Sequence, residues 1–315
     1  MKVVITGSAG FISSNLAKAC LEKGWNVRGV DNYSTGRKEL TRMFQKYKNF
    51  SFYLRDITKD PLIDIFAGAD IIFHLAALPR ISYSTDYPIE SNNANINGTL
   101  RVLEAAKSAS VKRLIYSASS SMYGGQDIPF PTPETTPAHP RSNYALQKHT
   151  GLEYCRLYSE LYGLDTASLI YFNICGQLQF ADNSYAGAIP AFFSAAVNNK
   201  PCRIDGDGNN SRDWTYVENV VQANILAAEY KGKLNGEHFN IGCGESYSVN
   251  EVFREVEKCV GHKLQYTHAP KRLGDPKKSL ADISKAKRVL GYEPKVKFYE
   301  AIKKTADWWM SGCKI

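Results

Sequence analysis

The chain changes its pattern of hydrophobic and polar residues at regular intervals through its first half. Short apolar runs, each about the length of a strand, stand at residues 2–6, 26–31, 50–56, 69–77, 111–119 and 165–172. Most of the stretches between them have a helical period; in residues 95–109, for example, Ile96, Leu100, Leu103 and Ala106 share one helical face. Strand–helix–strand repetition of this kind predicts a parallel sheet covered by helices on both faces. Because such crossovers are right-handed, the expected fold class is α/β with a doubly wound parallel sheet.

The regular alternation of strand-like and helix-like segments ends after residue 172. A loop-rich stretch precedes a helical pattern at 188–199, and a strand and a turn follow it. Residues 217–230 predict a strong helix, residues 237–242 predict another strand, and the tail 247–315 carries two helical patterns around KRLGDPKKS. We therefore expect residues 1–172 to form the sheet domain, to which 213–242 return. A smaller C-terminal lobe is expected from 173–212 and 243–315.

Size and cysteine usage narrow the class of protein. A chain of 315 residues with 43% hydrophobic and 22% charged residues is typical of a globular protein with a sizeable core. Its seven cysteines are spread singly without a C-x-x-C pair, which argues against a disulfide framework and against a metal site. The sequence shows no signal peptide and no apolar run that approaches about 18 residues. We expect a cytoplasmic protein that does not associate with membranes.

The formal charge of +8 bears on the partner. Lysines and arginines are scattered, and no basic block of the kind that binds nucleic acid is present, so no nucleic-acid partner is expected. A basic excess instead suits an anionic small substrate such as a nucleotide, although a solvated basic surface explains it equally simply.

The first apolar run leads into a glycine turn. Gly7 and Gly10 lie between this strand and a helical pattern, the arrangement of a Rossmann dinucleotide site, in which backbone N–H groups at the helix start face a pyrophosphate. Ser13 stands where a strict pattern has a third glycine. That glycine serves helix–strand packing, so Ser13 is interpreted as a tolerated change whose hydroxyl bonds to a carbonyl one turn earlier.

An acidic residue completes the dinucleotide pattern. Asp31 ends the second apolar run, 21 residues after Gly10, where a carboxylate accepts hydrogen bonds from the adenosine ribose. A carboxylate there repels a 2′-phosphate, which favours NAD over NADP, although Arg37 and Lys38 follow closely.

Two further segments carry candidate chemistry. In YALQK, Tyr144 and Lys148 stand four residues apart and so share a helical face. An ammonium beside a phenol favours the phenolate and makes it a usable general base. Upstream, the apolar run 111–119 ends in a row of serines, which either bind a substrate hydroxyl or cap the strand end.

These segments together resemble the extended short-chain dehydrogenase/reductases, specifically the UDP-sugar 4-epimerases. The resemblance covers essentially the whole chain. It rests on TGSAGFI, DNYSTG, RDI, HLAAL, NANINGT, SASSSMYG, YALQK, IYFN, GDGNNSRDWTYV, FNIG and RLGD. It implies an NAD-binding domain over 1–172 and a UDP-sugar-binding C-terminal lobe.

The resemblance assigns the cofactor and catalytic residues. It implies NAD contacts from Gly7, Gly10, Phe11, Ile12, Asp31, Asn32, Ser34, Thr35, Gly36, Asp56, Ile57, Leu75, Ala76, Ala77, Asn95, Tyr144, Lys148 and Phe172. It implies that Tyr144, with Ser119 and Lys148, removes the proton of the sugar 4-OH while the C4 hydride passes to NAD. The 4-keto intermediate then turns over and regains the hydride on its other face, which inverts C4. Related dehydratases and decarboxylases carry an acidic residue beside the serine, whereas this chain has Ser120 and Ser121.

The same resemblance implies a UDP-sugar site and a substrate class. Its substrate residues are Arg80, Ser84, Ser119, Ser120, Tyr144, Asn173, Gln179, Ala188, Arg212, Arg272, Asp275 and Ser279. Arg212 and Arg272 would meet the diphosphate, and Asp275 the uridine ribose. Relatives restricted to UDP-glucose and UDP-galactose have a bulky residue, often tyrosine, at the position of Ser279. The small Ser279 therefore favours UDP-N-acetylglucosamine 4-epimerase activity, together with activity on UDP-glucose.

Three departures keep alternatives open. Ile170 and Leu178 replace arginines that are common in the family, and Cys175 replaces an aromatic residue; the first two are expected to lie beside the sugar. The alternatives are a UDP-glucuronate 4-epimerase, with Arg80 as the cation facing the carboxylate, and a non-catalytic NAD- or sugar-nucleotide-binding module. Family members usually form homodimers through a four-helix bundle, and the same is expected here.

Overall fold

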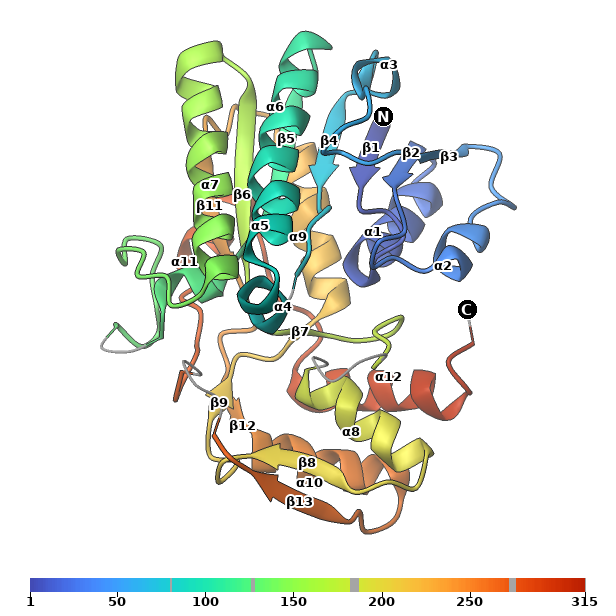
Figure 1. Ribbon diagram of the computed structural model, residues 1–315, viewed down its shortest axis with the longest axis vertical. Helices are drawn as coiled ribbons and strands as arrows, with labels where there is room; N and C mark the ends of the chain where they lie inside the picture. The colour runs from blue at the N-terminus through green and yellow to red at the C-terminus, as the bar shows by residue number, and fades with distance from the viewer. Residues whose placement is uncertain (80, 126–127, 182–186, 272–275, 315) are drawn as a thin grey trace.

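The computed structural model describes residues 1–79, 81–125, 128–181, 187–271 and 276–314 (Figure 1). Its centre is a seven-stranded sheet in which every neighbouring pair is parallel, in the order β11-β6-β5-β4-β1-β2-β3. These strands are β1 (Lys2–Thr6), β2 (Asn26–Asp31), β3 (Phe50–Leu54), β4 (Ile71–His74), β5 (Arg113–Ser119), β6 (Asp165–Tyr171) and β11 (Glu237–Ile241). Each of the six apolar runs contains one strand, which confirms the predicted fold class.

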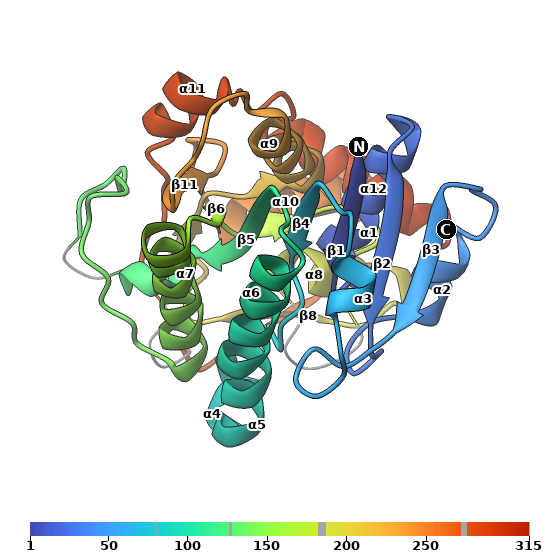
Figure 2. The ribbon, with the colours of Figure 1, turned by 90° about the horizontal axis from the view of Figure 1, so that it is seen from above.

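Helices cover both faces of the sheet (Figure 2). One face carries α3 (Ile63–Phe66), α6 (Gly98–Ser108) and α7 (Asn143–Tyr162), and the other carries α1 (Phe11–Glu22), α9 (Val217–Glu229) and α11 (Ser284–Leu290). The shorter helices α2 (Lys38–Arg42), α4 (Ile81–Asp86) and α5 (Pro88–Asn92) lie in connections. The strand order reverses between β1 and β4, which is where ligands bind in such sheets.

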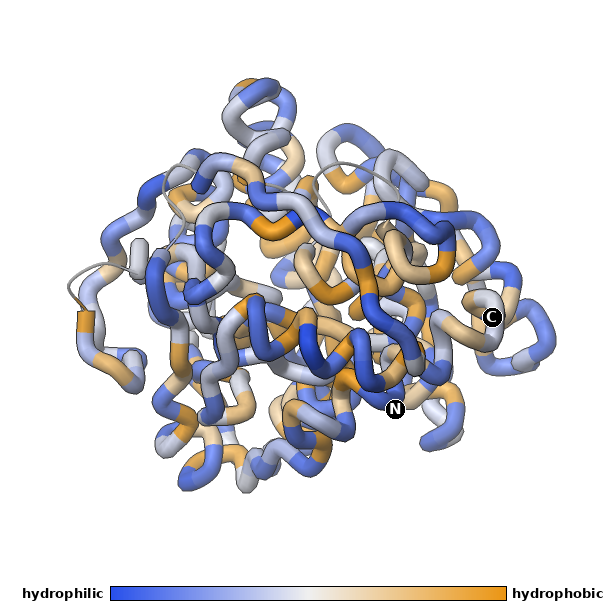
Figure 3. The backbone as a smooth tube through the Cα atoms, turned by 90° about the horizontal axis from the view of Figure 1, so that it is seen from below, coloured by the Kyte–Doolittle hydropathy of each residue, from blue (hydrophilic) through white to orange (hydrophobic). Residues whose placement is uncertain are grey.

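A second, smaller core lies beyond the carboxyl ends of the strands (Figure 1). It is built by the parallel pair β8 (Cys202–Asp205) and β13 (Tyr266–Ala269) with α8 (Ala188–Val197), α10 (Val249–Val260) and α12 (Phe298–Met310). The two-residue strands β7 (Ile174–Cys175), β9 (Ser211–Arg212), β10 (Thr215–Tyr216) and β12 (Tyr247–Ser248) connect the two parts. Figure 3 shows helices that alternate hydrophilic and hydrophobic segments, as expected for helices with one face against a core.

The structure corrects two helix predictions. The tail carries one helix before KRLGDPKKS and two after it, because Gly291, with φ +68°, ends α11 before α12 begins. The helix predicted over 95–109 starts with a π-turn at Asn93–Asn97 before α6. Within this turn the Asn95 side chain bonds to both backbone polar groups of Leu78 and to Gln147. The widened turn accommodates these tertiary bonds.

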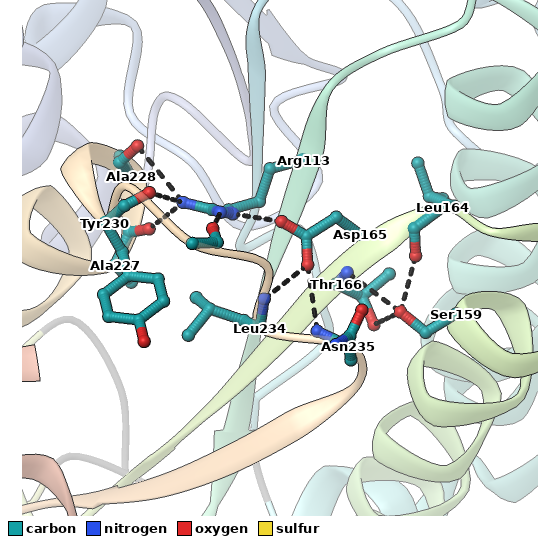
Figure 4. A network of polar contacts seen from close by, with 11 residues as sticks. Arg113, Ser159, Leu164, Asp165, Thr166, Ala227, Ala228, Tyr230, Leu234 and Asn235 are labelled. Atoms are coloured by element: carbon teal, nitrogen blue, oxygen red, sulfur yellow. Dashed lines mark hydrogen bonds and ion pairs between the residues drawn. The ribbon is translucent and has the colours of Figure 1, made fainter. Parts of the chain in front are cut away.

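A buried ion pair lies at the amino ends of β5 and β6 (Figure 4). Arg113 Nε lies 2.7 Å from Asp165 Oδ2, and both side chains are less than a tenth exposed. The guanidinium also donates to the carbonyls of Ala227 and Tyr230, and Asp165 Oδ1 accepts from the Leu234 N–H at 2.7 Å. The pair therefore fixes the connection between α9 and β11 to the amino ends of β5 and β6.

Candidate active site

A cavity of about 1290 Å³ lies at the carboxyl ends of the sheet strands, between the sheet and the second core. The glycine turn, the ends of β2, β4, β5 and β6, and the start of α7 line one part of it. Arg212, Pro276, Lys278 and Ser279 complete the wall from the second lobe. Segments far apart in the chain thus share one cavity at the position where such sheets bind ligands.

The glycine turn leaves the start of α1 open to an anion. Gly7 has φ +70°, and a Cβ there would lie 2.7 Å from the Cα of Ala76. Gly10 precedes α1, which has neither a side-chain cap nor an acidic residue in its first turn. Its first backbone N–H groups and positive dipole end therefore remain available to a pyrophosphate.

The carboxylate of Asp31 is held in place by backbone donors. It accepts the Ala9 N–H at 2.9 Å and the Tyr33 N–H at 2.7 Å, and burial raises its pKa. A Cβ on Gly36 would lie 2.6 Å from the Cβ of Ala9, so the loop after β2 packs closely over this carboxylate. A carboxylate has lone pairs beyond the two used here, and Asp31 lines the cavity. These features fit the adenosine ribose of NAD.

Most residues assigned to the cofactor lie in the cavity wall. The lining includes Phe11, Ile12, Asn32, Ser34, Thr35, Gly36, Asp56, Ile57, Leu75, Ala76, Ala77 and Phe172. Asn95 lies behind the wall, where it holds the backbone of Leu78. Ser13 lines the cavity, and the bond to an earlier carbonyl expected of it is made by Ser14, which donates to the Ser8 carbonyl at 3.2 Å.

Tyr144 and Lys148 occupy the first two turns of α7, whose N-cap is Ser142. The backbone N–H of Tyr144 donates to the Ser84 hydroxyl at 3.0 Å, and Ser84 is fully buried. Lys148 Nζ donates to the carbonyl of Ser117 at 2.8 Å, and burial lowers the pKa of this lysine to about 7. Both residues line the cavity.

Ser119 is the last residue of β5. Its Oγ lies 2.9 Å from the Oγ of Ser121 and caps the short helix at Ser120–Tyr123. Ser119 lines the same cavity as Tyr144 and Lys148. A hydroxyl, a phenol and a buried ammonium around one cavity are suited to removing a proton from a bound alcohol.

The substrate residues divide into three groups. Ser120, Asn173, Gln179, Arg212 and Ser279 line the cavity. Ser84 instead supports the start of α7, and Ala188 begins α8 against the second core. Arg80, Arg272 and Asp275 lie outside the described residues.

The two family arginines that this chain lacks have different surroundings. Leu178, with φ +66°, lines the cavity. Ile170 does not line the cavity that the described residues form: it is fully buried in β6, within the main core. The expectation that Ile170 lies beside the sugar is therefore wrong, because the lining of the cavity begins at Tyr171, where β6 ends, and Ile170 packs inside the main core.

Sequence reasoning missed several residues. Asp213 is fully buried next to Arg212, and its carboxylate accepts the N–H groups of Cys243, Gly244 and Ala281 at 2.7, 3.0 and 3.2 Å. Arg141 and Lys278 line the cavity. The only sequence signal was their position, three residues before Tyr144 and one before Ser279.

The cysteines, the possible metal ligands and the helix lengths bear on other kinds of site. All seven cysteines carry free thiols. Among the described residues, no group of three or more His, Cys, Asp or Glu side chains is placed to hold a metal. The described helices include none that is both long and apolar enough to span a membrane.

Comparisons with known proteins identify the family of the chain. Residues 3–242 match the NAD dependent epimerase/dehydratase family. The chain is 34% identical over 310 residues to a UDP-glucose 4-epimerase of Mycolicibacterium smegmatis, covering 98% of each protein. It matches the structure of a Thermotoga maritima UDP-glucose 4-epimerase with UDP-glucose at 35% identity and a TM-score of 0.93, over 100% of both chains.

A second similar structure is named for a different sugar nucleotide. A UDP-N-acetylglucosamine 4-epimerase of Methanobrevibacter ruminantium, in complex with UDP-N-acetylmuramic acid, gives a TM-score of 0.92 at 34% identity. This match covers 99% of the present chain and 98% of that one. The chain therefore belongs to the NAD dependent epimerase/dehydratase family, and NAD is the cofactor that its glycine turn and Asp31 fit.

Proposed function

We propose that the protein is an NAD-dependent UDP-sugar 4-epimerase that interconverts UDP-N-acetylglucosamine and UDP-N-acetylgalactosamine and also accepts UDP-glucose. The observation that carries the activity is the shared cavity of Ser119, Tyr144 and Lys148 beside the glycine turn. A non-catalytic binding module has no use for a phenol and a buried ammonium in this arrangement.

The residues divide the work as follows. The Ser119 hydroxyl orients the sugar 4-OH, and the Tyr144 phenolate takes its proton. Lys148 favours that phenolate through its charge. Bound NAD supplies the hydride acceptor for C4. The same tyrosine returns the proton to the 4-oxygen after the sugar has presented its other face, so a single general base serves both directions.

The sugar assignment depends on the space beside Ser279. The backbone N–H of Ser279 donates to the carbonyl of Ser211 at 3.0 Å, and its hydroxyl accepts from Asn173 Nδ2 at 3.3 Å. The residue is thus fixed at the cavity wall with a side chain of only two heavy atoms. This supports room for a 2-acetamido group, and the amide of Asn173 offers a polar partner for it.

The test is direct. The purified protein is incubated with UDP-N-acetylglucosamine, UDP-glucose or UDP-glucuronate, and the products are followed by proton NMR. We expect UDP-N-acetylgalactosamine as the main product of the first reaction. Failure to convert UDP-N-acetylglucosamine by a folded protein that contains NAD would overturn the assignment.

One observation favours a second candidate. The basic residues Arg141 and Lys278 line the cavity, and a UDP-uronic acid would present a carboxylate to them. Arg80, the cation expected for this role from the sequence, lies outside the described residues. Conversion of UDP-glucuronate alone in the same NMR experiment would favour this activity.

We also propose a homodimer. Ile89 on α5 is 85% exposed and Leu146 on α7 is 52% exposed. The two side chains line one shallow hollow between these helices. Exposed apolar residues that share a hollow suit a second copy of the chain. Light scattering of the wild type and of Ile89→Lys should show a dimer and a monomer, respectively.

A further inference from the structure

One contact links the cofactor loop directly to the second lobe. The guanidinium carbon of Arg37 lies 3.8 Å from the centre of the Phe180 ring. Arg37 ends the loop that packs over Asp31, whereas Phe180 follows β7 and packs against the second core. Both side chains are half-buried and both line the cavity. A cation this close to an aromatic face is within the range of a cation–π interaction.

Each partner is fixed from behind. The backbone N–H of Arg37 donates to the carbonyl of Ala9 at 3.0 Å, which fastens it to the glycine turn. The ring of Phe180 meets the ring of Trp308 in α12 edge to face at 5.1 Å, and Trp308 packs in turn against Trp309. The contact therefore joins the glycine turn to the packed rings of the second core, and a movement of the loop away from the second lobe would break it.

We propose that the Arg37–Phe180 pair is a clasp that retains NAD by closing the adenosine end of the cavity. The pair lies beside the Asp31 loop, which fits the adenosine ribose. Of the residues assigned to the UDP-sugar, Arg212 and Ser279 come from other segments of the second lobe, whereas Gln179 directly precedes Phe180. The inference rests on NAD binding and is independent of which sugar reacts.

The clasp suits the chemistry of an inverting enzyme. An epimerisation returns the cofactor to its starting state, so exchange between turnovers brings no benefit. Loss of the cofactor between the two hydride transfers would instead strand the keto sugar. Two side chains that tie the cofactor loop to the second lobe slow that loss without touching the reacting carbon.

The experiment measures cofactor exchange rather than turnover. Protein saturated with NAD is mixed with an excess of isotopically labelled NAD, and the label bound after rapid gel filtration is followed with time. We expect Phe180→Ala and Arg37→Ala each to accelerate exchange about tenfold, the size of one cation–π contact. The double variant should be no faster than the faster single variant, because each change breaks the same contact. Phe180→Tyr should exchange at the wild-type rate, since it keeps the ring.

Matched controls separate the clasp from general damage. Lys38→Ala removes the neighbouring cation, whose Nζ instead lies 5.8 Å from the Tyr33 ring, and should leave exchange unchanged. Phe180→Leu keeps the apolar packing without the aromatic face and should exchange as fast as Phe180→Ala. Slow, wild-type-like exchange in Phe180→Ala would overturn the proposal. An acceleration of exchange in the double variant equal to the product of the two single accelerations would also overturn it. Neither result depends on the UDP-sugar, because the exchange experiment contains none. A failure of the sugar assignment can therefore be distinguished from a failure of this proposal.

Discussion

The ammonium nitrogen of Lys148 lies 2.8 Å from the carbonyl oxygen of Ser117, a residue of the strand that ends in Ser119. This bond ties α7 to β5 at the point where the candidate base and the candidate serine meet the cavity. It also takes a cation out of water, because Lys148 is only 3% exposed.

Replacing Lys148 with methionine should lower turnover by about 100-fold or more. The change removes the charge that favours the Tyr144 phenolate but keeps much of the side-chain volume. Steady-state kinetics with saturating NAD would check this. A rate equal to that of the wild type would contradict the role of the ammonium.

The same substitution should change how stability depends on pH. Burial lowers the pKa of Lys148 from 10.5 to about 7. Between these values the unfolded chain binds a proton that the folded protein lacks, so this residue makes the protein more stable as pH rises from 7 to 10.5. Thermal melts of the NAD-free proteins at pH 7 and pH 10 should show a larger upward shift for the wild type than for Lys148→Met. Equal shifts would mean that burial does not lower the pKa of Lys148.

Tyr144→Phe should reduce turnover by about two to four orders of magnitude, because no other phenol at the start of α7 can accept the 4-OH proton. The NAD content of the purified protein should be unchanged. Tyr162→Phe is the control, since Tyr162 lies at the end of the same helix and is 53% exposed. Full activity in Tyr144→Phe would exclude it as the base.

Ser279→Tyr should shift the substrate preference away from N-acetylated sugars. A tyrosine fills the space beside Asn173, so the ratio of kcat/KM for UDP-N-acetylglucosamine to that for UDP-glucose should fall about tenfold or more. Ser279→Ala keeps the space and should keep the ratio. Parallel kinetics with both substrates would show the change, and an unaltered ratio in the tyrosine variant would place the acetamido group elsewhere.

Breaking the buried ion pair should destabilise the whole fold. Arg113→Ala leaves Asp165 charged and buried, which should lower the free energy of unfolding by about 3–5 kcal/mol. Lys303→Ala removes an exposed ion pair with Asp307 and should lower it by about 0.5 kcal/mol or less. Urea denaturation of the two variants is a matched comparison. Similar effects would show that burial gives the Arg113 pair no special weight.

Asp213→Asn should weaken UDP-sugar binding more than NAD binding. The asparagine keeps the shape, but its amide nitrogen would face backbone N–H groups that now donate to the carboxylate. Each hydrogen bond lost should cost about 1–3 kcal/mol of stability. Arg212 and the segment with Ser279 would then shift, which should raise KM for the UDP-sugar while bound NAD stays constant. The exposed Asp207→Asn should leave both unchanged.

Local patterns account for most of what the sequence predicted. The apolar runs specify the strands of the main sheet, and the spacings Gly7–Gly10 and Tyr144–Lys148 lie within one turn or one helix. Residues whose role depends on contacts with distant parts of the chain could not be predicted from the sequence. Asp213 gains its role from backbone groups 30 and 68 residues away. The Arg37–Phe180 contact joins two loops that are far apart in the chain. The hydrophobic periodicity of a segment does not indicate such a contact.

The error at Ile170 has a different origin. A family pattern compares single positions and does not say where a strand meets the cavity. Every residue of β6 is buried, and only the folded sheet shows that the lining of the cavity begins at Tyr171, the last residue of the strand.

Substitutions at the two ends of strands β5 and β6 should have different effects, on folding at one end and on catalysis at the other. Arg113 and Asp165 lie at their amino ends, whereas Ser119 and the cavity lie at their carboxyl ends. Natural variants at the first end would lower the amount of folded enzyme in a cell and leave the surviving molecules with normal kinetic constants. Variants at the carboxyl ends would change the kinetic constants and leave the amount of folded enzyme normal. A low activity in a crude extract therefore says little about the chemistry until the quantity of folded protein has been measured.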